Sequence, residues 1–378
     1  MKTISILGAG RVGSAIIQDL SRDQKYQIIA YDQNPAALEK VKDLDHVEWI
    51  RADLSDLEPL SSELDDCDLV ISAVPGGIGF QVLKQILQIG KNVVDISFFP
   101  EDPFDLDPLA RENNLTAVVD CGVAPGLCNM IAGHVVEKWD ETLTCTCYVG
   151  GLPVERTVPY QYKAVFSPAD VLEEYTRPAR LMRRGEIVTL PALSELEHIH
   201  FPGLGSLEAF NTDGLRTLLK TLPIRDMTEK TLRYPGHARL MEIFRDSGFF
   251  SPELIRIDGQ SISPLSLTSR LLFKEWHLEP GEKDLTVMKV ILSGTKNQEK
   301  TAVQFDLIDH YDPVLGVTSM SRTTGYTCAI IARQMLEGMI PEIGICPPEI
   351  IGRRAGCYQD LLENLAERGI DLQQSIPE

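Results

Sequence analysis

The chain has 378 residues and a net charge of −19, and 43% of its residues are hydrophobic. This length is sufficient for two domains with cores of their own. The negative charge argues against nucleic acid as a partner, because a phosphate backbone needs cationic contacts. No apolar run approaches the roughly 20 residues of a membrane helix, so we expect neither a membrane span nor a membrane partner.

A predicted strand occupies residues 4–7 at the very start of the chain. We therefore expect no signal peptide and a cytoplasmic location. The eight cysteines form no CxxC pair and no regular framework. This usage favours buried, reduced thiols over disulfides or a zinc site.

A glycine-rich turn follows the first strand and opens a helical pattern. Gly8, Gly10 and Gly13 form a GxGxxG motif, and a second predicted strand at 28–31 ends at Asp32. A GxGxxG motif alone is a weak signal. In a strand–turn–helix context with an acid at the end of the next strand, it is typical of a dinucleotide-binding Rossmann domain.

Each position in this motif has a physical reason. Gly8 permits the tight turn, Gly10 lets the backbone approach a pyrophosphate, and Gly13 lets the helix pack close to the sheet. The N–H groups at the start of the helix, at Arg11 and Val12, would then point at the anion.

Asp32 predicts NAD rather than NADP as the cofactor. Its carboxylate can accept hydrogen bonds from the ribose hydroxyls and would repel a 2′-phosphate. The following residues, Gln33, Asn34 and Pro35, provide no arginine or lysine for that phosphate.

The Rossmann pattern continues to residue 120. Further strands are predicted at 47–52, 69–73, 93–96 and 116–119, with helices at 79–87 and 109–113. Ligands of open α/β sheets bind beyond the carboxyl ends of the strands. The residues expected at that edge are Asp53, Ala73, Val74, Pro75, Asp95, Ser97, Asp120 and Gly122. Asp53 is expected near the adenine, and residues 73–75 near the nicotinamide.

The pattern changes after residue 126. A helix at 127–137 precedes longer strands with period-two patterning, at 142–149, 187–190, 286–293 and 302–309. They predict a second α+β domain with a mixed or antiparallel sheet. Residues 321–324 are expected to cap a helix at 326–336, and another helix is expected at 358–368.

The fold class is therefore α/β, with a doubly wound parallel sheet and a second α+β domain. We expect an NAD-binding Rossmann domain at 1–126 and a substrate and dimerisation domain at 127–312. The C-terminal helices at 313–378 are expected to return to the Rossmann domain.

The segments that carry a family resemblance include DCGVAPG (120–126), EYTRPAR (174–180), FNTDGLR (210–216) and TLRYPGH (231–237), and shorter matches lie at 162–163, 166–167, 322–325 and 347–349. With them the chain resembles the saccharopine dehydrogenase family over nearly its whole length, and within it most the lysine 6-dehydrogenase branch. The resemblance implies an NAD-dependent amine dehydrogenase with a small amino-acid substrate, built as a homodimer.

One position distinguishes the branches. Saccharopine reductases of this family tend to carry Pro-Asn-Arg-Asp-Ser where this chain has FNTDG at 210–214, which places Thr212 at the position of the arginine. A lost basic side chain suits lysine, which has fewer carboxylates than saccharopine.

The main interpretation is thus oxidative deamination of L-lysine at the ε-amino group, giving allysine, which cyclises to piperideine-6-carboxylate. A saccharopine or carboxylated-polyamine dehydrogenase is the enzymatic alternative. A non-catalytic NAD sensor is the alternative of another class.

Such chemistry needs a proton acceptor, because hydride leaves readily only from a neutral amine. Lys163 lies among aromatic residues, where desolvation would lower its pKa. His237 follows a Tyr-Pro-Gly turn and could titrate near neutral pH, or could brace the loop. Asp120, at the nucleotide edge, could hold the substrate ammonium or cap the next helix.

An α-carboxylate is best held by a bidentate arginine. Arg216 and Arg233 are the leading candidates, and Arg177 beside Tyr175 is the third; a solvated ion pair is the alternative for each. Gly122 is expected to contact the substrate from the DCGVAPG segment.

Two further patterns carry no predicted chemistry. Cys121 has no base at a matching spacing, which favours a small buried residue over a nucleophile. His198 and His200 lie near Glu195 and Glu197 in an acidic stretch, and we expect no metal there.

Overall fold

The computed structural model describes residues 1–279 and 281–377, and the chain divides into two compact units. The first unit contains residues 1–140, 220–222 and 321–372. The second contains residues 141–219, 223–320 and the segment that begins at Gln373. The two boundaries thus fall after Asp140 and after Met320, beyond the expected positions 126 and 312.

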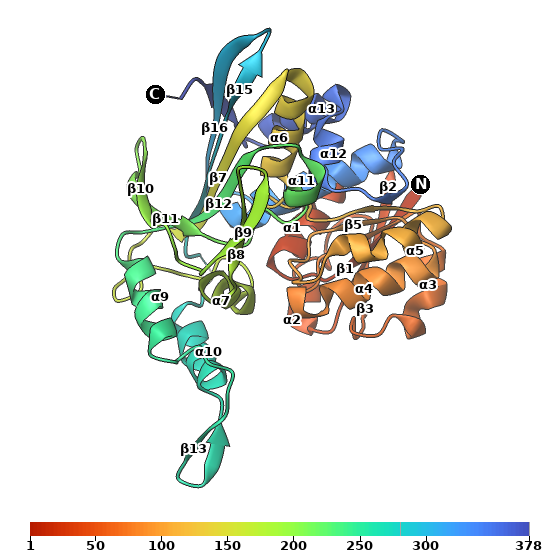
Figure 1. Ribbon diagram of the computed structural model, residues 1–378. Coiled ribbons are helices and arrows are strands. Elements are labelled where there is room, and N and C mark those ends of the chain that lie inside the picture. Colours follow the sequence, from red (N-terminus) through yellow and green to blue (C-terminus); the bar gives the residue numbers. More distant parts are fainter. Residues whose placement is uncertain (280, 378) are drawn as a thin grey trace. The chain divides into compact units, whose positions relative to one another are not determined.

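The first unit is built on a seven-stranded sheet in the order β17-β6-β5-β4-β1-β2-β3 (Figure 1). Every neighbouring pair in it is parallel. The strands are β1 (Lys2–Leu7), β2 (Tyr26–Asp32), β3 (Val47–Arg51), β4 (Leu69–Ser72), β5 (Val93–Asp95), β6 (Thr116–Val118) and β17 (Gly344–Ile345).

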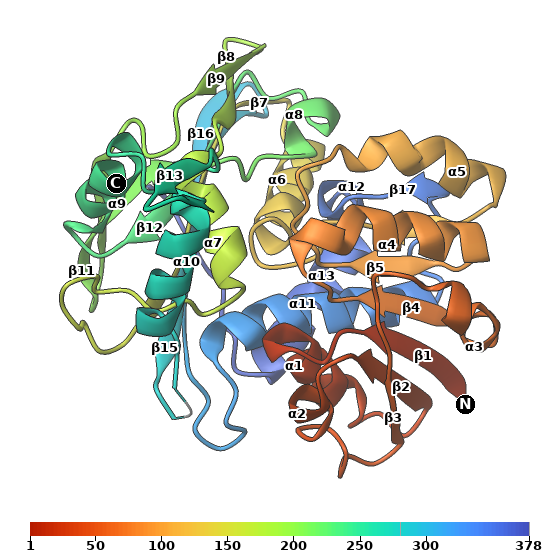
Figure 2. The ribbon, with the colours of Figure 1, turned by 90° about the horizontal axis from the view of Figure 1, so that it is seen from below.

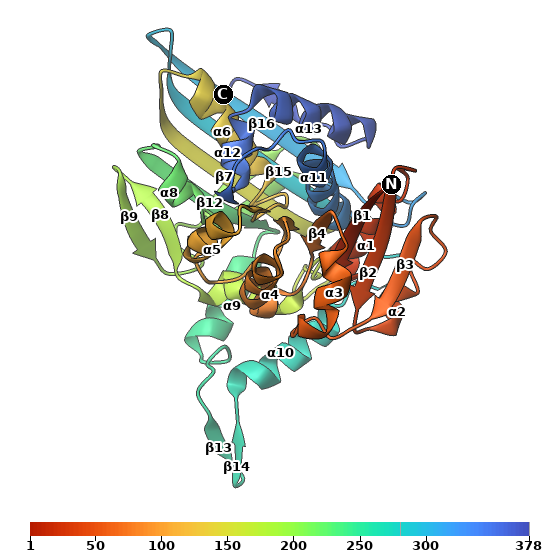
Figure 3. The ribbon, with the colours of Figure 1, turned by 90° about the vertical axis from the view of Figure 1, so that its right-hand side faces the viewer.

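Helices cover both faces of this sheet, as Figure 2 shows. On one face, α4 packs its buried residues Val82, Leu83 and Ile86 against apolar side chains of the strands. On the other face, α11 lies beside α1, with Gly325 close to Ala15 (Figures 2 and 3). The helices of this unit are α1 (Arg11–Leu20), α2 (Pro35–Leu38), α3 (Ser61–Asp65), α4 (Gly76–Ile89), α5 (Asp107–Glu112), α6 (Leu127–Lys138), α11 (Ser319–Leu336), α12 (Pro348–Gly352) and α13 (Ala355–Glu367), with 3₁₀ turns η1 (Glu58–Leu60) and η2 (Pro103–Leu106).

Helix α6 belongs to the first unit because two glycines let it touch α12. A Cβ on Gly133 would lie 2.0 Å from the Glu349 carbonyl oxygen, and one on Gly352 would lie 2.2 Å from the Met130 carbonyl oxygen. Backbone contact this close explains why the first boundary lies after α6 rather than before it.

The second unit contains a nine-stranded mixed sheet, with a main path β10-β11-β12-β7-β15-β16-β18. Only the β12–β7 pair is parallel among its described pairs; β8 joins β12, and β9 joins β8. The strands are β7 (Glu141–Pro153), β8 (Ala179–Arg183), β9 (Glu186–Leu190), β10 (Glu197–Phe201), β11 (Gly205–Asn211), β12 (Asp226–Arg233), β15 (Asp284–Lys296), β16 (Glu299–His310) and β18 (Gln373–Ser375).

One face of this sheet is covered by helices. Tyr175, Phe210, Ala238 and Trp276 form part of the apolar core between them. The helices are α7 (Pro168–Thr176), α9 (His237–Asp246) and α10 (Pro264–Glu275). The short helix α8 (Leu218–Thr221) crosses the boundary between the two units after Leu219. A separate hairpin of β13 (Ile255–Ile257) and β14 (Gln260–Ile262) extends beyond α9 and α10 (Figure 1).

The parallel sheet and the second, mixed sheet confirm the predicted fold class. The C-terminal helix differs from its expected form: residues 321–324 lie inside α11, which begins at Ser319. The helix is capped from elsewhere in the chain, since Asp284 accepts from the backbone N–H groups of Ser319 (2.7 Å) and Met320 (3.0 Å). Because Asp284 lies 35 residues before Ser319, the sequence around the start of α11 does not indicate this cap.

All eight cysteines are buried, and none of them forms a disulfide bond. Within residues 1–279 and 281–377, no helix is long and apolar enough to cross a membrane. In the same part of the chain, no group of His, Cys, Asp or Glu side chains has the arrangement of a metal site.

Candidate functional site

Three glycines shape the turn between β1 and α1. Gly8 has φ +103, and a Cβ there would lie 2.5 Å from the Ala73 carbonyl oxygen. A Cβ on Gly13 would lie 2.0 Å from the Gly8 carbonyl oxygen, so α1 packs directly onto the turn. Gly10 has no heavy atom within 4 Å of such a Cβ. Its backbone is therefore open to a ligand.

Helix α1 begins at Arg11, and no side chain caps its N-terminus at Gly10. Uncapped N–H groups and the helix dipole favour an anion at this position. A dinucleotide pyrophosphate bound here would be held by backbone N–H groups of the first turn, including those of Val12 and Gly13.

Asp32 is tied to this turn. Its carboxylate accepts from the backbone N–H of Ala9 (2.8 Å) and from that of Asn34 (2.8 Å). These two bonds hold the carboxylate at the carboxyl end of β2, next to the glycine turn. An adenosine ribose bound there would meet a fixed acceptor.

Arg51 is a residue that the sequence argument missed. It pairs with Asp32 in the β2–β3 register, and its Nε donates to the Gln33 carbonyl oxygen at 3.2 Å. A cation therefore does lie beside the predicted ribose position. The sequence could have indicated Arg51, because β3 lies next to β2 in a Rossmann sheet and the residues at the ends of the two strands are therefore neighbours.

The other predicted cofactor contacts lie at neighbouring strand ends. Asp53 follows β3, and its carboxylate accepts from the Ser55 N–H (3.0 Å) and hydroxyl (2.8 Å). Ala73 and Val74 follow β4, and Pro75 is the N-cap residue of α4. Their contacts with a cofactor stay predictions.

Two buried acids lie at the next strand ends. Asp95 ends β5 and is 0% exposed, while Asp120 follows β6 with φ +55 and is 2% exposed. Burial raises the pKa of Asp95 to about 7, although hydrogen bonds from Ser72 and Ser97 oppose the shift; the charge of Asp120 adds to it. Gly122 begins the turn before α6, where its N–H donates to the Pro125 carbonyl oxygen at 3.0 Å.

A second cluster of buried polar residues lies within the second unit, around Arg233. This side chain is 1% exposed and forms an ion pair with Glu174. Its Nε donates to the Tyr175 hydroxyl at 3.1 Å, and its Nη1 donates to the Leu232 carbonyl oxygen at 2.9 Å. Arg233 was predicted to clamp a substrate carboxylate, but its guanidinium is already bound by acceptors of the protein.

His237 is held on both sides. Its Nδ1 donates to the Tyr160 carbonyl oxygen (2.9 Å), and its Nε2 accepts from the Tyr175 hydroxyl (2.9 Å). Burial, followed by the charge of Arg233, lowers the pKa of His237 to about 3. This differs from the expected titration near neutral pH, and the hydrogen bonds correspond to the bracing role considered as the alternative.

The other predicted residues of the second unit are Lys163, Arg177 and Arg216. Lys163 donates to the His277 carbonyl oxygen at 2.8 Å and lies 3.5 Å from Glu282. Arg177 lies 3.2 Å from Glu173, one helical turn away. Arg216 is 6% exposed, with φ +45. Their parts in catalysis or substrate binding stay predictions.

Glu229 was not foreseen from the sequence. It is 4% exposed and accepts from the Thr212 hydroxyl (2.6 Å) and the Gly214 N–H (3.1 Å). Burial raises the pKa of Glu229 to about 8, against the hydrogen bond from Thr212, and Glu174 contributes to the increase. The period-two row Glu229–Thr231–Arg233 on one strand was the signal that could have revealed it.

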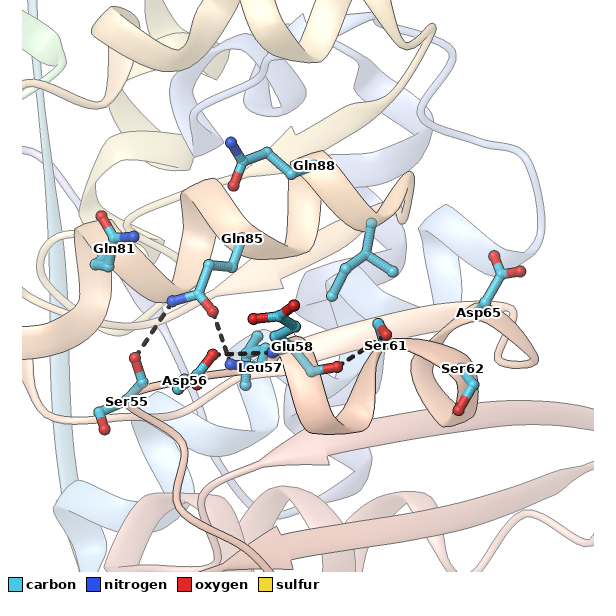
Figure 4. Close-up of a pocket in the computed structure, with 11 residues that line it drawn as sticks. Ser55, Asp56, Leu57, Glu58, Ser61, Ser62, Asp65, Gln81, Gln85 and Gln88 are labelled. Atoms are coloured by element: carbon cyan, nitrogen blue, oxygen red, sulfur yellow. Dashed lines mark hydrogen bonds between the residues drawn. The ribbon is translucent and has the colours of Figure 1, made fainter.

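Figure 4 shows a hollow of about 800 Å³ in the first unit, between α4 and residues 55–65. Gln85 spans it, donating to the Ser55 carbonyl oxygen at 3.3 Å and accepting from the Leu57 N–H at 2.7 Å. None of the residues predicted from the sequence to form a site lines this hollow, although Ser55 at its edge donates to the predicted adenine contact Asp53.

Comparison with known proteins identifies the family. Residues 4–118 match the saccharopine dehydrogenase NADP binding domain, and residues 122–370 match the saccharopine dehydrogenase C-terminal domain. The chain belongs to the saccharopine dehydrogenase family.

Individual relatives agree with this assignment. The chain is 22% identical to the saccharopine dehydrogenase [NADP(+), L-glutamate-forming] of Schizosaccharomyces pombe, over 100% of this chain and 99% of the relative. It is 25% identical to an α-aminoadipic semialdehyde synthase of Arabidopsis thaliana, over 80% of this chain but only 32% of the relative. The chain thus corresponds to about a third of that longer protein.

The fold is that of a solved family member. The apo saccharopine dehydrogenase (L-Glu forming) of Saccharomyces cerevisiae matches with a TM-score of 0.81 at 19% identity, with 100% of both chains covered. This similarity shows a shared fold, with the Rossmann unit and the mixed-sheet unit in one chain.

Proposed function

We propose that this protein is a pyridine-nucleotide-dependent oxidoreductase acting on a CH–NH group, and that its substrate is saccharopine, oxidised to L-glutamate and an aldehyde. The observation that carries the proposal is the end-to-end similarity to saccharopine dehydrogenases, which leaves neither unit of the chain unmatched. The uncapped N-terminus of α1 and the open backbone at Gly10 support the cofactor class.

The bound dinucleotide would supply the hydride acceptor. The protein's own residues would hold it by backbone N–H groups at the pyrophosphate and by Asp32 at the ribose. Asp120, near the carboxyl ends of β5 and β6, would lie on the edge where Rossmann domains bind their ligands.

A second candidate is oxidative deamination of L-lysine at the ε-amino group, and Thr212 favours it. Thr212 is buried, and its hydroxyl bonds Glu229 and lies 2.9 Å from the Thr231 hydroxyl. No cation is therefore presented from position 212, where saccharopine reductases tend to carry arginine. A substrate with fewer carboxylates needs fewer cations.

For the cofactor we propose NAD, on the strength of Asp32. Two relatives that match over nearly their whole length, the saccharopine dehydrogenases of Schizosaccharomyces pombe and Pyricularia oryzae, are named for NADP(+). Arg51, beside Asp32 in the β2–β3 register, offers a cation to a 2′-phosphate. An ionised acceptor fixed by Ala9 and Asn34 would nevertheless repel that phosphate at the ribose itself.

The test is reduction of NAD⁺ and of NADP⁺ by the full chain, with L-saccharopine and L-lysine assayed in parallel. We expect turnover with saccharopine. Turnover with lysine alone would replace the main proposal by the second candidate. Binding of the reduced dinucleotide without turnover of either amine would contradict both, and would favour the sensor.

A further inference from the structure

An arm of the second unit, residues 249–275, contains the hairpin of β13 and β14 and returns through α10. Asp258 and Gly259 join the two strands with φ +48 and +81, as the central residues of a tight two-residue hairpin turn require. Among the described strands, β13 and β14 pair only with each other. Because a lone two-stranded hairpin is marginally stable in water, this one is stabilised by any surface that covers one of its faces.

One face of the hairpin is apolar and exposed. Ile255 lies opposite Ile262 in the register, and Ile257, two residues along the strand, shares their face, which is called the isoleucine face below. Ile255 is 47% exposed and Ile257 is 44% exposed. Figures 1 and 3 show that the hairpin extends beyond α10, so this helix of the same chain does not cover the isoleucine face.

A second apolar surface lies on α10. Leu267 is 49% exposed and Leu271 is 61% exposed, and they are neighbours on the helix surface because they lie four residues apart. The buried residues of this helix are Thr268 and Leu272. The isoleucine face and this leucine pair thus lie in consecutive elements of one arm. Exposed apolar clusters that adjoin in this way mark interaction surfaces.

The charge of the arm indicates which partner covers these surfaces. Residues 249–275 contain three basic and three acidic side chains, so the arm is neutral and the rest of the chain carries the whole net charge of −19. Two acidic copies of the chain repel each other, and least where neutral arms meet, whereas a cationic partner is drawn to the acidic surface instead. One side of a standard protein interface uses roughly 20–30 residues, which is about the length of this arm.

We propose that two copies of this chain associate through their arms about a two-fold axis, with the isoleucine face of each hairpin covering the leucine pair of the other copy's α10. The same contact then forms twice, and the assembly closes at two copies.

Within one chain this contact has no room to form. Ser263 is the single residue between β14 and α10, and its hydroxyl caps the helix by accepting from the Ser266 N–H at 3.2 Å. So short a connection leaves the hairpin no length to fold back over its own leucine pair. The proposed surface lies inside the domain predicted for dimerisation, and it does not depend on the substrate.

The mass of the full chain in solution, from light scattering after size exclusion, tests the proposal. We expect twice the 42.0 kDa of one chain for the wild type. Ile255→Lys with Ile257→Lys charges the hairpin, and Leu267→Glu with Leu271→Glu charges the helix, so each double variant should have the mass of a single chain. All four side chains are exposed, so the variants should fold normally, which thermal unfolding checks.

A mixture of the two double variants tests the reciprocal contact. In the mixture, the lysines of one hairpin meet the glutamates of the other copy's helix, and the second contact keeps its apolar side chains, so the two-chain mass should return. Ile187→Lys with Val314→Lys, at exposed positions of the same unit outside the arm, is the matched control and should keep the two-chain mass.

Three results would overturn the proposal. One is a wild type with the mass of a single chain, which would leave the arm to a partner of another kind. The second is a two-chain mass kept by both double variants of the arm. The third is a mixture that stays at the mass of a single chain.

Discussion

The carboxylate of Asp32 accepts a hydrogen bond of 2.8 Å from the backbone N–H of Ala9, and so links the end of β2 to the glycine turn that follows β1. One residue thus both shapes the nucleotide edge and sets the charge at the ribose position. Arg51 lies opposite Asp32 in the register of β2 and β3. The choice between NAD and NADP therefore depends on whether the Asp32 anion or the Arg51 cation dominates at the ribose 2′ position.

Asp32→Asn should reverse the cofactor preference. Loss of the charged acceptor should weaken NAD⁺ binding about tenfold, which corresponds to about 1.4 kcal/mol, and should strengthen NADP⁺ binding by removing repulsion. Dissociation constants from fluorescence titration with both dinucleotides measure this. Adding Arg51→Ala should abolish the gain for NADP⁺, while Asp56→Asn should change neither constant. An unchanged ratio of the two affinities in Asp32→Asn would contradict the role of this carboxylate.

Gly13→Ala should abolish dinucleotide binding and lower the free energy of unfolding by about 1–3 kcal/mol. The added Cβ would lie 2.0 Å from the Gly8 carbonyl oxygen, so α1 must move away from the turn. Gly356→Ala is the matched control, because Gly356 lies in the first turn of α13 with no atom within 4 Å of its Cβ position. Denaturant unfolding and calorimetric titration would measure both effects. Equal behaviour of the two variants would contradict the close-packing argument.

Glu229 should make stability depend on pH in a defined direction. Its pKa is about 8 in the folded protein and close to 4.5 when unfolded, so folding favours the protonated form. Stability should therefore be complete below about pH 4.5 and fall as pH rises towards 8, by at most about 1.4 kcal/mol per unit. Glu229→Gln should flatten this part of the curve of unfolding free energy against pH. A parallel curve for the variant would show that the pKa of Glu229 does not rise on folding, and would contradict this prediction.

Glu174→Ala should destabilise the second unit by about 3–5 kcal/mol, because it leaves the buried Arg233 guanidinium without its carboxylate. Arg239→Ala breaks an ion pair with Glu242 in which the arginine side chain is 72% exposed, and should cost under about 1 kcal/mol. Thermal and urea unfolding of the two variants would give the comparison. Similar losses in both would mean that burial does not strengthen the Glu174 pair.

What could be predicted from the sequence is what is local or periodic. The glycine turn, Asp32 and the alternation of strands with helices are encoded within about 30 residues of each other, so the first unit was predictable nearly strand by strand. The seventh strand, β17, was not, because two residues at 344–345 reach β6 from more than 200 positions away.

The polar contacts of the second unit were not predictable for the same reason. Arg233 could be recognised as important from its segment, but its partner Glu174 lies on another element, 59 residues upstream. His237 likewise bonds Tyr160 and Tyr175, which its own neighbourhood does not indicate. Sequence patterns identified these residues, and only the folded chain shows with which atoms they interact.

The most direct test of the proposed function is product analysis after incubation of the full chain with L-saccharopine and oxidised dinucleotide. The account predicts L-glutamate in a one-to-one ratio with reduced dinucleotide. Release of ammonia from L-lysine with no L-glutamate from saccharopine would contradict the main proposal in favour of the second candidate. Absence of any product, with the reduced dinucleotide still binding, would contradict an amine-oxidising function altogether.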